Sequence, residues 1–170
     1  MLGYVIAQGR GVADALLAET ARRLLSLRWR VAGVVQINRE TARDGRCDMD
    51  LMVLDHDHVV RISQDLGPHA RGCRLDTAGL EQAVGLVEQA LARAPQLLIV
   101  NKFGKSEIEG RGFRHAIGLA LAEGVPVLTA VNASNLDGFI AFSEGLAEPV
   151  APDGDAILDW CHRVCAVAQD

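Results

Sequence analysis

The stretch LLIVNKFGKSEIEGRGFRHAI, residues 97–117, decides the fold that the rest of the chain must complete. Four apolar residues lead into Asn101, and eleven mostly polar or glycine residues separate it from Phe113, where we expect a helix to begin. Continuous apolar runs are typical of parallel strands that are buried on both faces. Loops at the carboxyl ends of such strands are where open α/β sheets hold their ligands. The stretch therefore predicts a parallel α/β sheet with a site at one edge.

The same loop concentrates charge. It holds the chain's two lysines, Lys102 and Lys105, and beside them Glu107, Glu109 and Arg111. Arginines are also frequent in other segments that we interpret as loops, whereas the acidic residues lie mostly on predicted helices and near the carboxyl terminus. An acidic protein with cationic loops suggests a small anionic ligand.

Hydrophobic periodicity extends this pattern along the chain. We expect further strands at 3–7, 31–36 and 125–131, and helices at 13–28, 77–94, 113–123, 136–146 and 157–168. Residues 50–55 and 59–63 alternate as a β-hairpin does, while two long polar stretches, 37–48 and 64–76, are interpreted as loops. Alternating strands and helices indicate one domain, residues 1–170, with a three-layer, mostly parallel α/β sheet and an edge β-hairpin.

Composition limits the classes of function. The formal net charge of -5 disfavours nonspecific binding to nucleic acid or to anionic membranes. No apolar run approaches the ~20 residues that cross a bilayer. The first residues, MLGYVIAQGRG, are interpreted as a strand and not as a signal peptide, so we expect a cytoplasmic protein. Oligomeric state, including a homo-oligomer, is left open.

The first strand, turn and helix, VIAQGRGVADALL, occupy the position of a phosphate-binding P-loop. That motif needs glycines, a lysine for the β and γ phosphates, and a hydroxyl for magnesium. Gly9 and Gly11 are present, but Ala13 and Asp14 stand where the lysine and hydroxyl are expected. Asn101 stands where an acidic magnesium ligand would end a core strand, and an amide does not replace a carboxylate there. ATP or GTP hydrolysis is therefore not expected.

The candidate ligand-binding residues lie in the predicted turns and loops. Arginine suits planar or tetrahedral oxyanions because its donors form a fixed fork. The set is Gln8, Gly9, Arg10, Gly11, Arg46, Gln64, Arg71, Arg74, Asp76, Asn101, Lys102, Lys105, Glu107 and Arg111. No catalytic residue and no cofactor are assigned.

The four cysteines show no CxxC spacing. Cys47 and Cys73 follow cations in similar loop sequences, so a soft-metal site remains an alternative, although we assign no metal. Cys161 and Cys165 are one helical turn apart, and we expect them to be reduced, small apolar residues on the inner face of the last helix.

Four strings carry a resemblance that runs nearly end to end: ISQDLG (62–67), GCRLD (72–76), NKFGKSEIEGRG (101–112) and VPVLTAVN (125–132). By these the chain resembles a bacterial family of uncharacterised proteins often encoded beside molybdate-transport and molybdenum-enzyme genes. That family is similar in layout to P-loop nucleoside-triphosphatases.

The resemblance implies a P-loop-NTPase-like fold, and with the residues above it favours binding of a small anion, either an oxyanion such as molybdate or a phosphate-bearing ligand, in molybdenum metabolism. Two alternatives stay open. One is a nucleotide-dependent hydrolase or transferase of molybdenum metabolism that uses Lys102, Lys105 and Glu107. The other is a metal-binding or partner-docking protein that uses Cys47 and Cys73.

Overall fold

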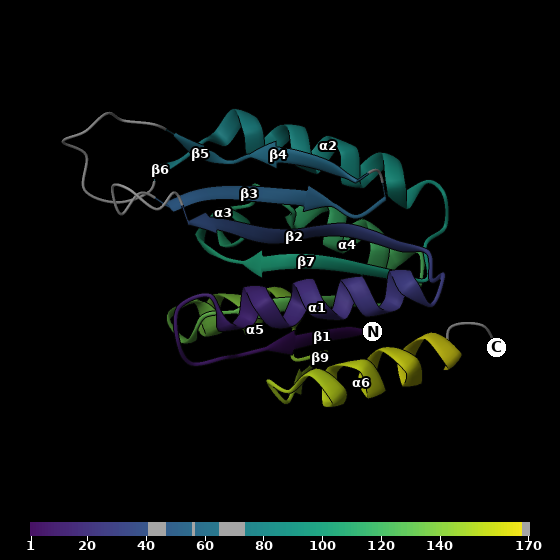
Figure 1. The fold of residues 1–170 in the computed structure, drawn as a ribbon. Helices are drawn as coiled ribbons and strands as arrows, with labels where there is room; N and C mark the ends of the chain where they lie inside the picture. Colours follow the sequence, from purple (N-terminus) through teal and green to yellow (C-terminus); the bar gives the residue numbers. More distant parts are fainter. Residues whose placement is uncertain (41–46, 56, 65–73, 168–170) are drawn as a thin grey trace.

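The computed structural model describes residues 1–40, 47–55, 57–64 and 74–167. A seven-stranded sheet runs through them, with helices on both faces (Figure 1). Its strands are β1 (Leu2–Val5), β2 (Val31–Glu40), β3 (Cys47–Val53), β4 (His58–Arg61), β7 (Leu97–Phe103), β8 (Val127–Val131) and β9 (Ala147–Val150). The short strands β5 (Ser63–Gln64) and β6 (Arg74–Leu75) pair separately. The helices are α1 (Val12–Ser26), α2 (Thr77–Leu91), α3 (Lys105–Ile108), α4 (Arg114–Ala122), α5 (Leu136–Ser143) and α6 (Gly154–Val167), with a 3-10 turn η1 (Ala133–Asn135).

The sheet is mostly parallel. In the order β4-β3-β2-β7-β8-β1-β9, the five strands from β2 to β9 run parallel, and β3 and β4 add an antiparallel edge. This arrangement confirms the predicted three-layer sheet and its edge hairpin.

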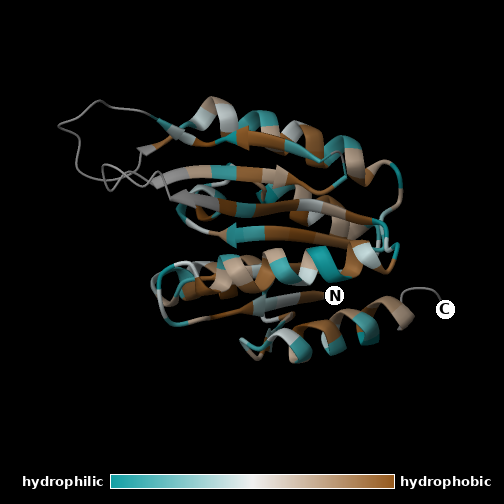
Figure 2. Cartoon of the chain, in the orientation of Figure 1, coloured by the Kyte–Doolittle hydropathy of each residue, from teal (hydrophilic) through white to brown (hydrophobic). Residues whose placement is uncertain are grey.

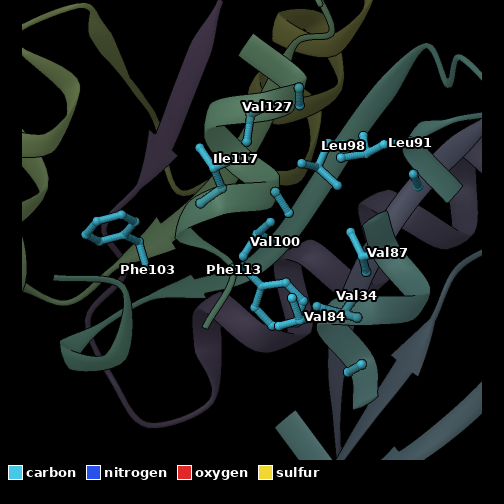
Figure 3. Packing of buried hydrophobic residues seen from close by; sticks show 14 of the residues in the cluster. Val34, Val84, Val87, Leu91, Leu98, Val100, Phe103, Phe113, Ile117 and Val127 are labelled. Atoms are coloured by element: carbon cyan, nitrogen blue, oxygen red, sulfur yellow. The ribbon is translucent and has the colours of Figure 1, made fainter. Parts of the chain in front are cut away.

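The central strand β7 shows why both faces are covered. Leu98 and Val100 enter the core beneath α2 and α4, whereas Leu97 and Ile99 enter the core beneath α1 and α6. Alternate residues of a strand point to opposite faces, so a continuous apolar run needs two covering layers. Figure 3 shows the first core, and Figure 2 shows the apolar residues gathered along the inner strands.

The parallel strands β2 and β7 approach closely at Gly33. Its φ of +118° is unfavourable for other residues, and a Cβ there would lie 1.8 Å from the carbonyl oxygen of Ile99. The backbone geometry of β2 thus depends on this one glycine.

Four expectations were wrong in detail. The segment 64–76, expected to be a loop, contains the short strand β6, which pairs with β5. Residues 37–48 are not simply a loop, because β2 continues to Glu40 and β3 begins at Cys47. The polar sequence did not predict these strands because two paired strands can extend beyond the core without an apolar face. The helix from Leu136 ends at Ser143, and the edge strand β9 follows it; its short sequence AEPV has no strand-like alternation. The 102–112 loop contains the short helix α3.

In the described part of the chain, every helix is too short or too polar to span a membrane.

Candidate functional site

The strand order places a switch point between β1 and β8. From β1 the chain passes through α1 to β2 on one side, and from β8 it passes through α5 to β9 on the other side. Ligands of open α/β sheets bind outside the carboxyl ends of strands where neighbouring connections diverge in this way. Because β1, β7 and β8 are parallel, the loops after them all leave the sheet at this edge. The arrowheads of β1 and β7 mark it on the left in Figure 1. The candidate site is therefore at the carboxyl edge of β1, β8 and β7.

The turn between β1 and α1 is built on glycine. Gly9 and Gly11 have φ values of +98° and +76°, and Gly11 is the N-cap of α1 without a side-chain cap. Gln8, Gly9 and Arg10 are exposed. Backbone N–H groups at such a helix start favour anions. The turn therefore brings Arg10 and the start of α1 to the same edge.

Asn101 joins three elements at this edge. Its side chain is buried with 3% exposure; Oδ1 accepts a hydrogen bond from the Gln36 backbone N–H at 2.8 Å, and Nδ2 donates to Asp14 Oδ1 at 2.9 Å. The carboxyl end of β7 is thereby tied to β2 and to the first turn of α1. Both polar atoms of the amide take part in hydrogen bonds between elements, so Asn101 has a structural role in this arrangement.

Lys102 lies near the loop after β8. A Cβ built on Gly104 would have Lys102 Cε and Asn135 Nδ2 each at 3.9 Å, so the two side chains approach the same point. Lys102 is exposed, and no carboxylate among the described residues lies within ion-pair distance of it. Lys102 is thus a cation at the switch-point edge that forms no ion pair with the described residues.

Glu107 closes its own loop. Its carboxylate accepts hydrogen bonds from the backbone N–H groups of Gly104 at 2.9 Å and Phe113 at 3.0 Å, and it is 5% exposed. Burial raises the pKa of Glu107, against the opposing effects of these two hydrogen bonds and of the Lys102 charge. The structure gives this predicted site residue an internal role in holding residues 104–113.

The other cations of the loop are paired. Lys105 Nζ lies 3.8 Å from a carboxylate oxygen of Glu109, and Arg111 also pairs with Glu109. Asp76 is the N-cap of α2 and accepts a hydrogen bond from the Ala78 N–H at 3.0 Å. Lys105, Arg111 and Asp76 thus have local partners, whereas Lys102 forms no ion pair within the described part of the chain.

The remaining candidates are placed less fully. Gln64 is exposed in β5, and Arg74 pairs with it through the backbone in β6. Cys47 begins β3, while Arg46, Arg71 and Cys73 lie outside the described residues. The described residues contain no group of three or more His, Cys, Asp or Glu side chains able to hold a metal ion.

The prediction that Cys161 and Cys165 lie on the inner face of the last helix is confirmed. Cys161 and Cys165 are free, buried thiols. Burial raises the pKa of Cys161 to about 12 and that of Cys165 to about 11. Both remain protonated and unreactive at neutral pH.

The family match spans most of the fold, from residue 2 to residue 160, and the family is described as a protein of unknown function, DUF2478. The chain belongs to this family. This DUF2478 chain is also 35% identical over 147 residues to the molybdenum import ATP-binding protein ModC 2 of Bradyrhizobium diazoefficiens. The match covers 86% of this chain and 16% of that protein, so the chain spans only a small part of its relative's length.

Two solved structures share the fold. A human cancer-related nucleoside triphosphatase superposes with a TM-score of 0.62 at 17% identity, covering 99% of this chain and 96% of that one. THEP1 from Aquifex aeolicus superposes with a TM-score of 0.66 at 13% identity, covering both chains fully at 100%. These likenesses confirm the P-loop-NTPase-like fold class for this DUF2478 chain.

Sequence reasoning missed two features of the site. The contact between Asn101 and Asp14 joins residues 87 positions apart, and no sequence signal announces it. The turn after β8 presents Asn132 and Ser134, both exposed, and Asn135 beside Lys102. The signal for that turn was available, because it follows a buried strand as the 102–112 loop does.

Proposed function

We propose that the chain binds a small anion, an oxyanion or a phosphate-bearing ligand, at the carboxyl edge of β1, β8 and β7. The observation that carries the proposal is the switch point, where the exposed glycine turn with Arg10 and Lys102, which forms no ion pair with a described residue, occupy one edge. Two cations beside backbone N–H groups at a helix start are a favourable environment for negative charge.

The turn after β1 and the end of β7 do not carry the residues that P-loop enzymes use for hydrolysis. Residues 8–18 contain no lysine, serine or threonine. Asn101 is an amide, and its oxygen accepts the Gln36 N–H instead of facing a metal. Positioning of phosphates by a lysine and of magnesium by a hydroxyl and a carboxylate is the basis of phosphoryl transfer in P-loop enzymes. Binding without turnover is the function that this geometry supports.

The similarity to a molybdenum import ATP-binding protein supports a place for this chain in molybdenum metabolism. Molybdate is a tetrahedral oxyanion, a shape that arginine and lysine donors accommodate. We therefore propose molybdate as the first ligand to test, acting in solution and without nucleic acid or membrane as a partner.

The test is a thermal-shift panel of molybdate, tungstate, sulfate, phosphate, ATP and GTP on the purified chain. A bound anion stabilises the folded state by about 2.7 kcal/mol at a hundredfold excess over its dissociation constant. We expect at least one oxyanion or phosphate compound to raise the melting temperature. A panel without any shift would refute the proposal.

Hydrolysis is measured separately, as phosphate release from ATP and GTP with magnesium. We expect no turnover above background. Turnover near ~1 per second, inside the usual range of enzymes, that disappears in Lys102→Ala would show that the chain is an enzyme.

A further inference from the structure

A carboxylate stands where the proposed ligand meets helix α1. Asp14 lies in the first turn of α1, two residues beyond its first residue, Val12. Negative charge in this turn interacts favourably with the positive end of the helix dipole, and it therefore offsets part of the attraction that this helix start offers to a bound anion. A carboxylate at this position therefore lowers the affinity of the site for an anion.

The position of this carboxylate is fixed. Asn101 Nδ2 donates to Asp14 Oδ1 at 2.9 Å, and Asn101 is itself held by the Gln36 N–H. Asp14 is half-buried, and Asn101 is buried. An amide that donates to the carboxylate restrains its position relative to the carboxyl end of β7.

We propose that Asp14 is a charge filter, which weakens the binding of dianions more than that of monoanions at the switch-point edge. This inference rests on the proposed anion-binding function. The charge of Asp14 acts together with the cations Arg10 and Lys102 and with Asp137, in the first turn of α5. Because Coulomb energy is proportional to ligand charge, a fixed carboxylate repels a dianion twice as strongly as a monoanion of the same shape.

The experiment uses two tetrahedral oxyanions that differ in charge, perrhenate with one negative charge and molybdate with two. Dissociation constants are measured by calorimetry at pH 7.5 and constant ionic strength, for the wild-type chain and for Asp14→Asn. The substitution keeps the acceptor oxygen for Asn101 and removes only the charge. Circular dichroism and the melting temperature establish that the variant is folded, and Asp14→Ser provides a second neutral variant with an acceptor oxygen.

Glu123→Gln is the matched control. Glu123 follows α4, exposed, before the start of β8, and so lies at the opposite edge of the sheet. Its substitution changes the net charge of the chain by the same amount as Asp14→Asn. Charges farther apart than about 8 Å are largely screened at physiological salt, so the control should leave both dissociation constants unchanged.

We expect Asp14→Asn to tighten molybdate binding about tenfold and perrhenate binding about threefold. These factors correspond to a separation of about 6 Å in water between the Asp14 carboxylate and the bound anion. Equal effects on both anions, weaker molybdate binding, or equal effects in Glu123→Gln would overturn the charge filter while leaving anion binding in place. If neither anion binds to the wild type or to either Asp14 variant, the charge filter fails, and the thermal-shift panel decides separately whether the chain binds any other anion.

Discussion

Asn101→Asp would place a second carboxylate against Asp14. Asn101 Nδ2 now donates to Asp14 Oδ1 at 2.9 Å, and the substitution replaces this donor by an acceptor of nearly the same shape. The hydrogen bond from the Gln36 N–H to position 101 can persist, since the oxygen that accepts it is retained. The perturbation is therefore local: one favourable contact becomes a repulsion between two charges.

The magnitude follows from the distance. Two unit charges 2.9 Å apart repel by about 1.4 kcal/mol in water and by about 6 kcal/mol at an effective dielectric constant of 20. The pair can escape by taking up one proton, which costs about 4 kcal/mol at pH 7 for a carboxyl with an ordinary pKa near ~3.9. We therefore expect the free energy of unfolding to fall by about 2 to 4 kcal/mol at pH 7.

The pH dependence has a definite sign. Repulsion raises the pKa of the pair in the folded state, so the folded protein holds a proton that the unfolded protein releases. The destabilisation should be absent below about pH 4, the unfolded pKa, and should grow as the pH rises through the raised folded value.

The assay is urea unfolding of four proteins: wild type, Asn101→Asp, Asp14→Asn and the double variant. In the double variant a carboxylate and an amide face each other again, with their positions exchanged, so most of the lost stability should return. A coupling free energy near zero across this cycle, or a stable Asn101→Asp variant at pH 7, would refute the structural role given to the contact.

Three further predictions test the surrounding structure. Glu107→Gln should lower the free energy of unfolding by about 1 to 3 kcal/mol, because one of two buried N–H donors loses its acceptor. Because burial raises the pKa of Glu107, the stability of the wild type relative to this variant should decline as the pH rises above about 4.5. A rise in relative stability over this range would contradict the prediction. Gly33→Ala should lower the free energy of unfolding by more than about 4 kcal/mol, measured by thermal unfolding, because the new Cβ would lie 1.8 Å from the carbonyl oxygen of Ile99. The control is Gly118→Ala in α4, which should leave stability nearly unchanged because a Cβ at this exposed position has no other atom within 4 Å. Purified protein should contain no stoichiometric zinc by elemental analysis, and one zinc per chain lost on Cys73→Ser would show otherwise.

Much of the fold could be predicted because periodicity reports burial. The runs around Leu98 and Val127 are continuous because both faces of the sheet are covered, and that pattern alone identified the central strands. Strand β9 gave no such signal, since it contains Glu148 and Pro149 and, among the described strands, pairs with β1 alone. Short edge strands depend on their neighbours more than on their own sequence.

The sheet edge that the candidate residues share could be predicted, but their contacts could not. Loops after parallel strands leave the sheet at one edge, and the topology has the loops that follow β1 and β7 at the same edge. Which charges remain available depends on side-chain contacts that a sequence does not display. Glu107 accepts hydrogen bonds from two backbone N–H groups, and Lys105 pairs with Glu109. Lys102 forms no ion pair with a carboxylate among the described residues.

The two lysines offer the most direct test of anion binding at this edge. Lys102 stands at the switch point, and Lys105, three residues away, is exposed and pairs with Glu109. Molybdate and phosphate affinities are measured by calorimetry for the wild type, Lys102→Ala and Lys105→Ala. We predict that Lys102→Ala weakens the affinity for the anion at least tenfold, as expected for loss of a charge-assisted hydrogen bond worth about 1.5 to 3 kcal/mol. Lys105→Ala should change that affinity less than about twofold. Equal losses in both variants, or undiminished binding in Lys102→Ala, would contradict the assignment of the site.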